Sequence, residues 1–329
     1  MANDKLDALR KKLRVQPTDV LEPVKSLSTG IVAFDEVMGG GLPEGKVVEL
    51  FGDFASGKSL LVYHALKRLQ AEGGLGVLVD TEDALNFAWA KALGLDVDKL
   101  IYVSPVTSGE ELTIEYVFKL LEDFVRSVEA DEKLKKTPCI FAWDSVAATK
   151  SAEEGEELIY KPEMASRARV IGQLIRKIPT LIAGTRISFV LVNQLRDKPG
   201  VMYGAKEDTP GGRAIKFHAH LRLLMKKGQK VKDEDAVTGM NGTLFVEKSK
   251  VSRPFRQVNF QLSFDSGIDK FSGLQDLLIR EGVVEAEKAG WCKLNKLKFR
   301  RLDEAIWDKI KRIRAGEDIG GDLPEEDSK

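Results

Sequence analysis

The chain has 329 residues, and its 51 Lys and Arg balance its 51 Asp and Glu, so the formal net charge at pH 7 is zero. This length predicts roughly two domains. A hydrophobic fraction of 43% with 31% charged residues is typical of a globular protein and excludes a disordered or fibrous one. The charge balance also excludes a uniformly basic nucleic-acid coat protein, so any DNA-binding surface must be local.

Cysteine usage and the amino-terminal segment indicate the compartment. Cys139 and Cys292 form no CxxC pair, which argues against a disulfide scaffold and a zinc ribbon and favours a reducing environment. Charges are spread through the first residues, unlike a signal peptide, and no apolar run approaches the roughly 20 residues of a membrane span. We therefore expect a cytoplasmic protein without a membrane partner.

Residues 1–25 are expected to form a short helix and a linker. Asn3 is the predicted cap, and Pro17 and Pro23 predict an extended linker after the helix. Its apolar residues recur at helical spacing: Leu6, Leu9 and Leu13. So small a helix cannot bury this apolar stripe alone, so it either folds back on the core or packs on a neighbouring copy.

Residues 26–268 alternate apolar runs with helical stretches and predict an α/β core. The runs of strand length are Val47–Phe51, Gly76–Val79, Ile101–Val103, Ile140–Trp143 and Ile187–Asn193. Such continuous apolar runs are typical of parallel strands that helices cover on both faces. A helix is expected over 110–128 with Ser108 as its cap. Phe217–Met225 and Gln257–Phe264 alternate with period two, like antiparallel edge strands.

A small domain is expected over 269–315, where the composition shifts. Its predicted helices are Leu274–Arg280 and Leu302–Ile313. They would surround a short core that contains Trp291. Basic residues outnumber acidic ones between positions 293 and 314, whereas the tail, 316–329, is acidic.

A phosphate-binding loop is the clearest motif. Gly52-Asp-Phe-Ala-Ser-Gly-Lys58-Ser59 fits GxxxxGK[ST] between a predicted strand and a predicted helix. Backbone N–H groups would face the phosphates, Lys58 would add a positive charge, and the Ser59 hydroxyl would ligate Mg²⁺. The residues expected to hold ATP here are Gly52, Asp53, Phe54, Ala55, Ser56, Gly57, Lys58, Ser59 and Leu60.

Carboxylates at the ends of other strands would complete an NTPase site. Asp144 ends an apolar run and is expected to hold the water shell of the Mg²⁺. A carboxylate that activates water is expected on the strand next to the loop strand, and Val77–Asp80 followed by Glu82 supplies it. Glu82 is the candidate base or orienting group, and Asp80 is then structural.

Several further segments carry a family resemblance in their order and spacing. They are Ser28-Thr-Gly30, Gly39-Gly-Gly-Leu-Pro43, Asp80-Thr-Glu82-Asp-Ala-Leu85, Asp144-Ser-Val-Ala-Ala148, Asn193-Gln194-Leu-Arg196, Gly200-Val-Met202-Tyr-Gly204, Gly211-Gly212 and Ala214-Ile-Lys216-Phe217. Together with the phosphate loop they make residues 26–291 similar to the bacterial RecA recombinase family. Asp197, Pro199 and an acidic stretch at 153–157 depart from the family pattern and indicate a divergent member, of viral or otherwise unusual lineage.

The resemblance implies roles for individual residues in a RecA-like core. Glu82 would activate the hydrolytic water, and Gln194 would sense the γ-phosphate. Lys248 and Lys250 would reach the ATP of a neighbouring protomer, like arginine fingers. The adenine would lie against Asn86, Trp89 and Phe264.

The resemblance also implies that single-stranded DNA binds inside a helical filament, through loops at about 153–165 and 195–213. The residues that would contact it are Met164, Arg169, Arg176, Arg196, Gly211, Gly212 and Arg213. Arginines and backbone N–H groups bind phosphates without reading sequence, and an apolar side chain can wedge between bases. The small carboxy-terminal domain would capture duplex DNA, and the acidic tail would be autoinhibitory.

The predicted function is therefore a DNA-dependent ATPase of homologous recombination and DNA repair, including the SOS response to DNA damage. Filaments on single-stranded DNA would pair that strand with homologous duplex DNA and exchange strands. Two alternatives stay open: a ring helicase or motor on the same core, and a recombination mediator that uses ATP as a conformational clamp. Filaments rather than rings in the electron microscope would favour the first prediction.

Overall fold

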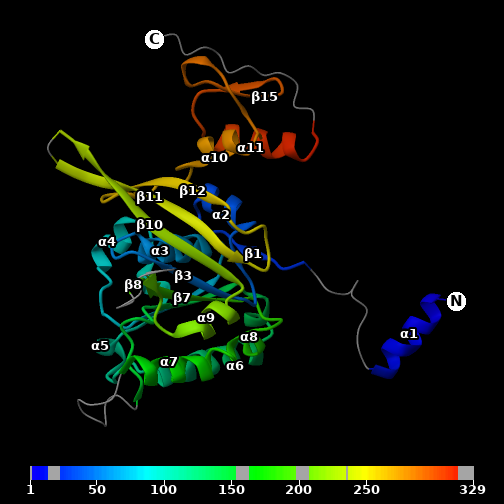
Figure 1. The fold of residues 1–329 in the computed structure, drawn as a ribbon, viewed down its shortest axis with the longest axis vertical. Helices are drawn as coiled ribbons and strands as arrows, with labels where there is room; N and C mark the ends of the chain where they lie inside the picture. Colours follow the sequence, from blue (N-terminus) through cyan, green and yellow to red (C-terminus); the bar gives the residue numbers. More distant parts are fainter. Residues whose placement is uncertain (1, 14–22, 153–162, 198–206, 235, 318–329) are drawn as a thin grey trace.

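The computed structural model describes residues 2–13, 23–152, 163–197, 207–234 and 236–317. A nine-stranded sheet runs through its centre (Figure 1). In spatial order its strands are β13 (Gly267–Ile268), β12 (Gln257–Ser263), β11 (Ala236–Ser249), β10 (Leu221–Asp233), β3 (Val47–Gly52), β7 (Ile187–Gln194), β6 (Cys139–Asp144), β4 (Leu75–Asp80) and β5 (Leu100–Val103). The six strands from β10 to β5 are parallel, and the three at the other edge are antiparallel. The predicted α/β fold with a mostly parallel sheet is confirmed.

Helices cover both faces of this sheet, which is why its central strands are continuous apolar runs. One face packs against α2 (Val32–Met38), α3 (Lys58–Ala71) and α4 (Phe87–Ala92). The other packs against α6 (Ile114–Ala130), α7 (Glu163–Leu174), α8 (Ile178–Leu181) and α9 (Gly212–His218). Successive side chains of β3 point to opposite faces of the sheet. Val48 and Leu50 pack in the apolar cluster on the α2–α4 side, and Val47 packs in the cluster on the α6–α9 side.

Short elements complete the core. They are the paired strands β1 (Ser26–Leu27) and β2 (Leu42–Pro43), the helix α5 (Pro105–Ser108), and the paired strands β8 (Arg196–Asp197) and β9 (Glu207–Asp208). Single turns of 3-10 helix occur at Val97–Lys99, Leu134–Lys136 and Lys288–Gly290.

Three predicted boundaries were wrong for local reasons. The helix expected from 110 begins at Ile114 because Thr113 caps it, accepting a hydrogen bond from the Tyr116 N–H at 3.1 Å, whereas Ser108 ends α5. The alternating segment from Phe217 begins inside α9, and β10 lies between β3 and β11 rather than at an edge. The first helix, α1 (Ala2–Leu13), begins before Asn3, which therefore lies within it.

The carboxy-terminal part contains both predicted helices and a small sheet. Its elements are α10 (Leu274–Arg280), β14 (Glu285–Ala286), β15 (Cys292–Leu294), β16 (Leu297–Phe299) and α11 (Glu304–Arg314). Phe299, Trp307 and Ile310 are its buried centre, while Trp291 is only partly buried. These residues belong to the same apolar cluster as α2 and α3, so this part packs directly on one layer of the core.

The helix α1 lies apart from the rest of the ribbon (Figure 1). Leu9 is 51% exposed and Leu13 is 61% exposed. Leu9 and Leu13 therefore do not pack on the described core, and packing on a neighbouring copy stays a prediction. None of the helices in the described part of the chain is both long and apolar enough to cross a bilayer.

Candidate active site

The carboxyl ends of four adjacent parallel strands bring the predicted site residues together. Gly52 at the end of β3 is in register with Gln194 at the end of β7, and the Leu195 N–H donates to the Gly52 carbonyl at 3.1 Å. Asp144 at the end of β6 is in register with Asp80 at the end of β4. Ligands of open α/β sheets bind at this edge, where the loops diverge.

The phosphate loop joins β3 to α3 as predicted. Gly57 precedes the helix with a left-handed φ of 92°, and no side chain of the described residues caps the helix, so its first N–H groups are open to an anion. The Lys58 ammonium donates to the carbonyls of Gly52 at 3.3 Å and Asp53 at 2.6 Å. Burial lowers the pKa of Lys58, although Asp144, Asp53 and Glu82 oppose that shift.

Gly52 is required by a neighbouring backbone. Its φ is 152°, and a Cβ built there would meet the Met225 carbonyl oxygen of β10 at 1.9 Å. No side chain fits at this position without separating β10 from β3. The first glycine of the motif therefore serves the sheet as well as the phosphate loop.

Two observations support a phosphate and Mg²⁺ at this loop. The buried Ser56 hydroxyl has no hydrogen-bond partner among the described residues, as expected of a group that a ligand completes. Burial raises the pKa of Asp144 to about 6, and a hydrogen bond from Ser59 partly offsets this shift. The hydroxyl and the carboxylate that Mg²⁺ prefers are thus adjacent to each other.

Glu82 lies just beyond β4, but β4 is not next to the loop strand. β7 and β6 separate β4 from β3, so that expectation was wrong. Glu82 is nevertheless directed toward the site, because its carboxylate accepts a hydrogen bond from the Ser145 hydroxyl at 2.8 Å, directly after Asp144. Its electrostatic interaction with Lys58 also indicates that it faces the phosphate loop.

The structure supports a structural role for Asp80. This buried carboxylate accepts hydrogen bonds from the backbone N–H groups of Glu82, Ala84 and Leu85 and from the Tyr102 hydroxyl, over 2.9–3.2 Å. Its oxygens are therefore committed to the loop that carries Glu82. Asp80 fixes the backbone of that loop and is not available to water.

The residues expected at the adenine come from two distant segments. The Trp89 indole N–H donates to the Phe264 carbonyl at 3.1 Å, and the Trp89 ring packs edge-to-face on Tyr63 at 6.1 Å. Asn86 caps α4 by accepting from the Trp89 N–H at 3.0 Å. The pairing of Trp89 with the half-exposed Phe264 leaves an aromatic surface near α3, while Asn86 has a local structural role.

Lys248 and Lys250 lie away from the phosphate loop of their own protomer. Lys248 is in register with Arg222, near the amino end of the parallel strands, and its ammonium donates to the carbonyls of Lys216 and Phe217 at the end of α9. The Lys250 ammonium lies 5.8 Å from the centre of the Phe217 ring. Any phosphate contact of these lysines must therefore involve another protomer.

The residues predicted to bind DNA gather on α7, α9 and the segments beside them. α7 and α9 pack on each other (Figure 1), and the side chains of Arg169, Arg176 and Arg213 are exposed. Arg196 donates to the Ala147 carbonyl at 3.2 Å. Gly211 precedes α9 with a φ of 91°.

Several parts of the predicted DNA loops lie outside the described residues. These are the side chain of Met164 and residues 153–162 and 198–206, which include Pro199. Gly212, the first residue of α9, has a φ of 65°, and the backbone of Asp197 pairs with that of Glu207.

A buried charged network beside the site was not predicted from the sequence. Glu49 of β3 is fully buried and accepts from Arg222 at 2.5 Å and from the Asn193 side chain at 3.2 Å, and Arg222 also pairs with Glu247. Asn193 further donates to the Pro210 carbonyl at 2.9 Å. A glutamate inside an apolar strand run was the available signal, since a buried charge needs a partner.

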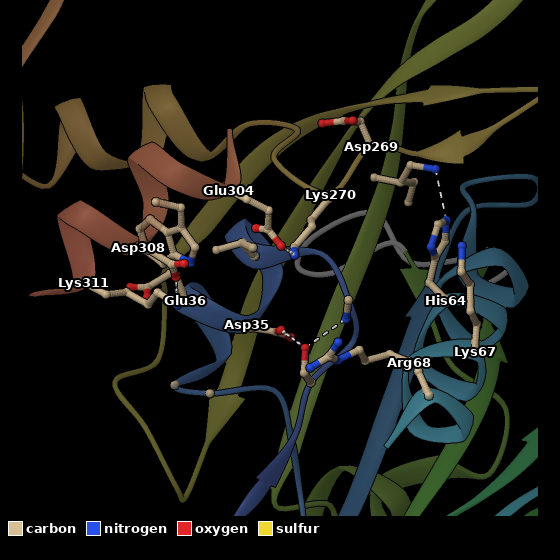
Figure 2. A pocket seen from close by; sticks show the side chains of 18 of the residues that line it. Asp35, Glu36, His64, Lys67, Arg68, Asp269, Lys270, Glu304, Asp308 and Lys311 are labelled. Atoms are coloured by element: carbon tan, nitrogen blue, oxygen red, sulfur yellow. Dashed lines mark hydrogen bonds and ion pairs between the residues drawn. The ribbon is translucent and has the colours of Figure 1, made fainter. Parts of the chain in front are cut away.

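A cavity of about 1040 Å³ lies elsewhere, between α2, α3 and α11 (Figure 2). The phosphate loop does not line it. Its charges largely pair with each other: Arg314 contacts Glu36 at 3.0 Å, and Lys270 contacts Glu304. It contains His64, which accepts from the Ile268 N–H at 3.1 Å.

Comparison with known proteins assigns the family. Residues 12–269 match the RecA N-terminal domain family. Protein RecA of Chlorobium limicola is 34% identical over 321 residues, which cover 93% of this chain and 88% of the relative. Protein RecA of Paracoccus denitrificans is 36% identical over 311 residues, which cover 90% of this chain and 83% of that relative. With the strand order, the phosphate loop and this similarity over most of its length, the chain belongs to the RecA family.

Proposed function

We propose that this protein is a DNA-dependent ATPase that forms helical filaments on single-stranded DNA and catalyses homologous pairing and strand exchange in the cytoplasm. The convergence of the phosphate loop, Asp144, Glu82 and Gln194 at one sheet edge carries the proposal. Family membership supports it, and the exposed leucines of α1 favour assembly with a second copy.

In the proposed hydrolysis, the open N–H groups at the start of α3 and Lys58 bind the β- and γ-phosphates of ATP. A water oxygen forms a bond to the γ-phosphorus, and the bond from that phosphorus to the bridging oxygen breaks, leaving its electron pair on ADP. The carboxylate of Glu82 accepts the proton of the water. Gln194, beside Gly52, contacts the γ-phosphate and loses that contact after hydrolysis.

Mg²⁺ would neutralise charge on the phosphates and would be held by Ser59 and Asp144. Lys248 and Lys250 would complete the site from the adjacent protomer, since their position excludes the loop of their own chain. Trp89 and Phe264 would hold the base. These roles predict that the site is complete only at a protomer interface.

The proposed DNA surface is built from α7, the start of α9 and their flanking segments. Arg169, Arg176, Arg196 and Arg213 would bind phosphates, with the N–H groups near Gly211 and Gly212 and the side chain of Met164 between bases. The part from 269 to 315 would capture duplex DNA, and the acidic tail from 316 would compete with DNA for basic surface. The negative charge of Asp197 is unfavourable near DNA phosphates. We therefore expect this departure from the family pattern to weaken strand exchange more than ATP binding.

The test is the ATPase rate with and without single-stranded DNA, with the same samples examined by negative-stain microscopy. Stimulation by DNA together with helical filaments is expected. Glu82→Gln should bind ATP and DNA normally and lose hydrolysis by roughly a hundredfold or more. Hydrolysis that ignores DNA, or closed rings alone, would contradict the recombinase and favour a motor or a regulatory ATPase. Normal hydrolysis by Glu82→Gln would exclude Glu82 as the base.

A further inference from the structure

Ser145 is a buried hydroxyl directly after the proposed Mg²⁺ residue Asp144, and it contacts the proposed base. It is 1% exposed, and its hydroxyl lies 2.8 Å from Glu82 Oε1. The Ala148 N–H donates to the same hydroxyl oxygen at 3.3 Å. An ionised carboxylate has no proton to give, so the single hydroxyl proton must point to Glu82.

The backbone of Ser145 is held from several directions. Its N–H donates to the Thr81 hydroxyl at 3.1 Å, and its carbonyl accepts from the Thr149 hydroxyl at 2.7 Å. The Trp143 indole N–H donates in turn to the Thr149 hydroxyl at 2.9 Å. Ser145 is therefore a fixed donor rather than a side chain that adapts to Glu82.

Glu82 by contrast has little else to hold its side chain. It is exposed in the protomer, and Asp80 fixes only its backbone, through the Glu82 N–H. A free glutamate side chain loses considerable rotamer entropy when it is ordered. A hydrogen bond at Oε1 removes much of that freedom before ATP binds and leaves Oε2 for a water.

We propose that Ser145 is a positioning residue for hydrolysis: its hydroxyl orients the Glu82 carboxylate so that Oε2 faces the attacking water. This inference rests on the proposed role of Glu82 and adds a residue that acts only through it. The same short turn after β6 then serves both the Mg²⁺, through Asp144, and the base, through Ser145. ATP binding does not require this hydrogen bond, because Ser145 belongs to neither the phosphate loop nor the aromatic surface.

The experiment compares Ser145→Ala with Ser188→Ala in the full chain, in the presence of single-stranded DNA. Ser188 is also buried, on β7, and its hydroxyl has no partner among the described residues, so the control makes the same change without touching Glu82. We expect Ser145→Ala to lower kcat about tenfold and to leave the Kd for a fluorescent ATP analogue within about twofold. Ser188→Ala should change neither, and Ser145→Thr, which keeps the donor, should restore most of the rate.

A double-mutant cycle separates positioning from general structural damage. In a Glu82→Gln background, residual hydrolysis followed over long incubations should fall less than about twofold when Ser145→Ala is added. An equal loss in both backgrounds, a matching loss of nucleotide affinity, or a wild-type kcat for Ser145→Ala would overturn the positioning role. If Glu82→Gln has no measurable rate, two results test the positioning role instead. They are a loss of kcat in Ser145→Ala without a loss of nucleotide affinity, and the recovery of kcat in Ser145→Thr.

The outcomes also separate this inference from the proposed function. Inactive Glu82→Gln together with fully active Ser145→Ala contradicts the positioning role alone. Active Glu82→Gln contradicts the base and the positioning role together. If thermal unfolding shows that Ser145→Ala does not fold, Ser145→Cys, a weaker donor, takes its place and should give an intermediate kcat.

Discussion

Individual side chains at the strand ends have distinct surroundings, which their residue types alone do not reveal. Asp80, Glu82 and Asp144 are three carboxylates close together, yet Asp80 is saturated by backbone N–H groups and Glu82 receives a serine hydroxyl. Asp144 is next to Ser59, and burial raises its pKa to about 6. The surroundings of the three carboxylates therefore differ, in line with the separate roles proposed for them.

Gly52→Ala tests the close approach of β10 to the phosphate loop. Because the added Cβ would lie 1.9 Å from the Met225 carbonyl oxygen, we expect the free energy of unfolding to fall by about 3 kcal/mol. Gly109→Ala is the control, since Gly109 also has a positive φ, 68°, but, apart from its chain neighbours, no atom of the described residues lies within 4 Å of its added Cβ. It should cost about 1 kcal/mol. If urea unfolding showed the same loss of unfolding free energy for Gly52→Ala and Gly109→Ala, the close approach of β10 would not be the reason for the glycine.

His64 predicts an acid-sensitive contact between α3 and β13. Burial lowers the pKa of His64 to about 4 from a usual 6.5, and its neutral ring accepts the Ile268 N–H. A depressed histidine pKa means that the unfolded chain binds the proton first, so stability is lost as pH falls from 6.5 through 4. The loss should approach about 3 kcal/mol.

His64→Gln isolates that contribution, because a glutamine oxygen can accept the same N–H and does not titrate. The free energy of unfolding of the wild type should fall more steeply than that of the variant between pH 6.5 and 4. Parallel pH profiles in chemical denaturation would mean that His64 is not held neutral in the folded protein.

At the scale of elements, the helix α1 is amphipathic but uncovered. Leu9 and Leu13 are exposed, and an apolar stripe of this kind is stabilised only by burial on another surface. Packing on a neighbouring copy, the second expectation from the sequence, therefore stays a prediction that needs a test. The apolar residues of the sheet are different, because helices of the same chain already bury them.

Leu9→Glu combined with Leu13→Glu should weaken assembly without damage to the site. We expect the protein concentration needed for filaments to rise at least about tenfold, because two leucines lose their burial. Binding of ATP by the protomer should be unchanged. Lys11→Glu, on the opposite side of the helical wheel, is the matched control. Sedimentation and microscopy measure filament length as a function of protein concentration. If the double leucine variant and Lys11→Glu gave the same filament lengths, the apolar stripe of α1 would not be the assembly surface.

At the scale of the whole molecule, the residues proposed to act on ATP lie at two opposite ends of the parallel strands. The phosphate loop lies at the carboxyl ends of the parallel strands, whereas Lys248 and Lys250 lie at the amino end of β10, beside α9. One chain cannot bring these groups to one nucleotide. Assembly must supply the missing contacts if the lysines act on ATP.

Mixing two inactive variants tests this division. Lys58→Ala removes the phosphate contact, and Lys248→Ala with Lys250→Ala removes the proposed contact from the neighbour. In an equal mixture, one interface in four joins an intact phosphate loop of one protomer to intact lysines of its neighbour. The mixture should therefore recover about a quarter of the wild-type DNA-stimulated rate. No recovery, despite mixed filaments verified by labelling, would place the lysines outside the hydrolytic site.

The sequence alone predicted the fold class, the phosphate loop and the family, since each depends on local pattern. Continuous apolar runs mark buried parallel strands, and GxxxxGK[ST] between a strand and a helix specifies its own backbone course. Helix boundaries were less accurate because a cap is decided by hydrogen bonding: Thr113, not Ser108, accepts from the first turn of α6.

Tertiary structure alone decided which distant groups meet. The order β3, β7, β6, β4 follows from how crossover helices cover the sheet, and no local pattern specifies which strand becomes the neighbour of another. Likewise, the hydrogen bond from Ser145 to Glu82 and the buried pair of Glu49 with Arg222 join residues far apart in the chain. The sequence by itself therefore determined the chemistry available to this protein. Packing of the sheet determined the hydrogen bonds and the burial of each carboxylate, because these arise only once the strands are side by side.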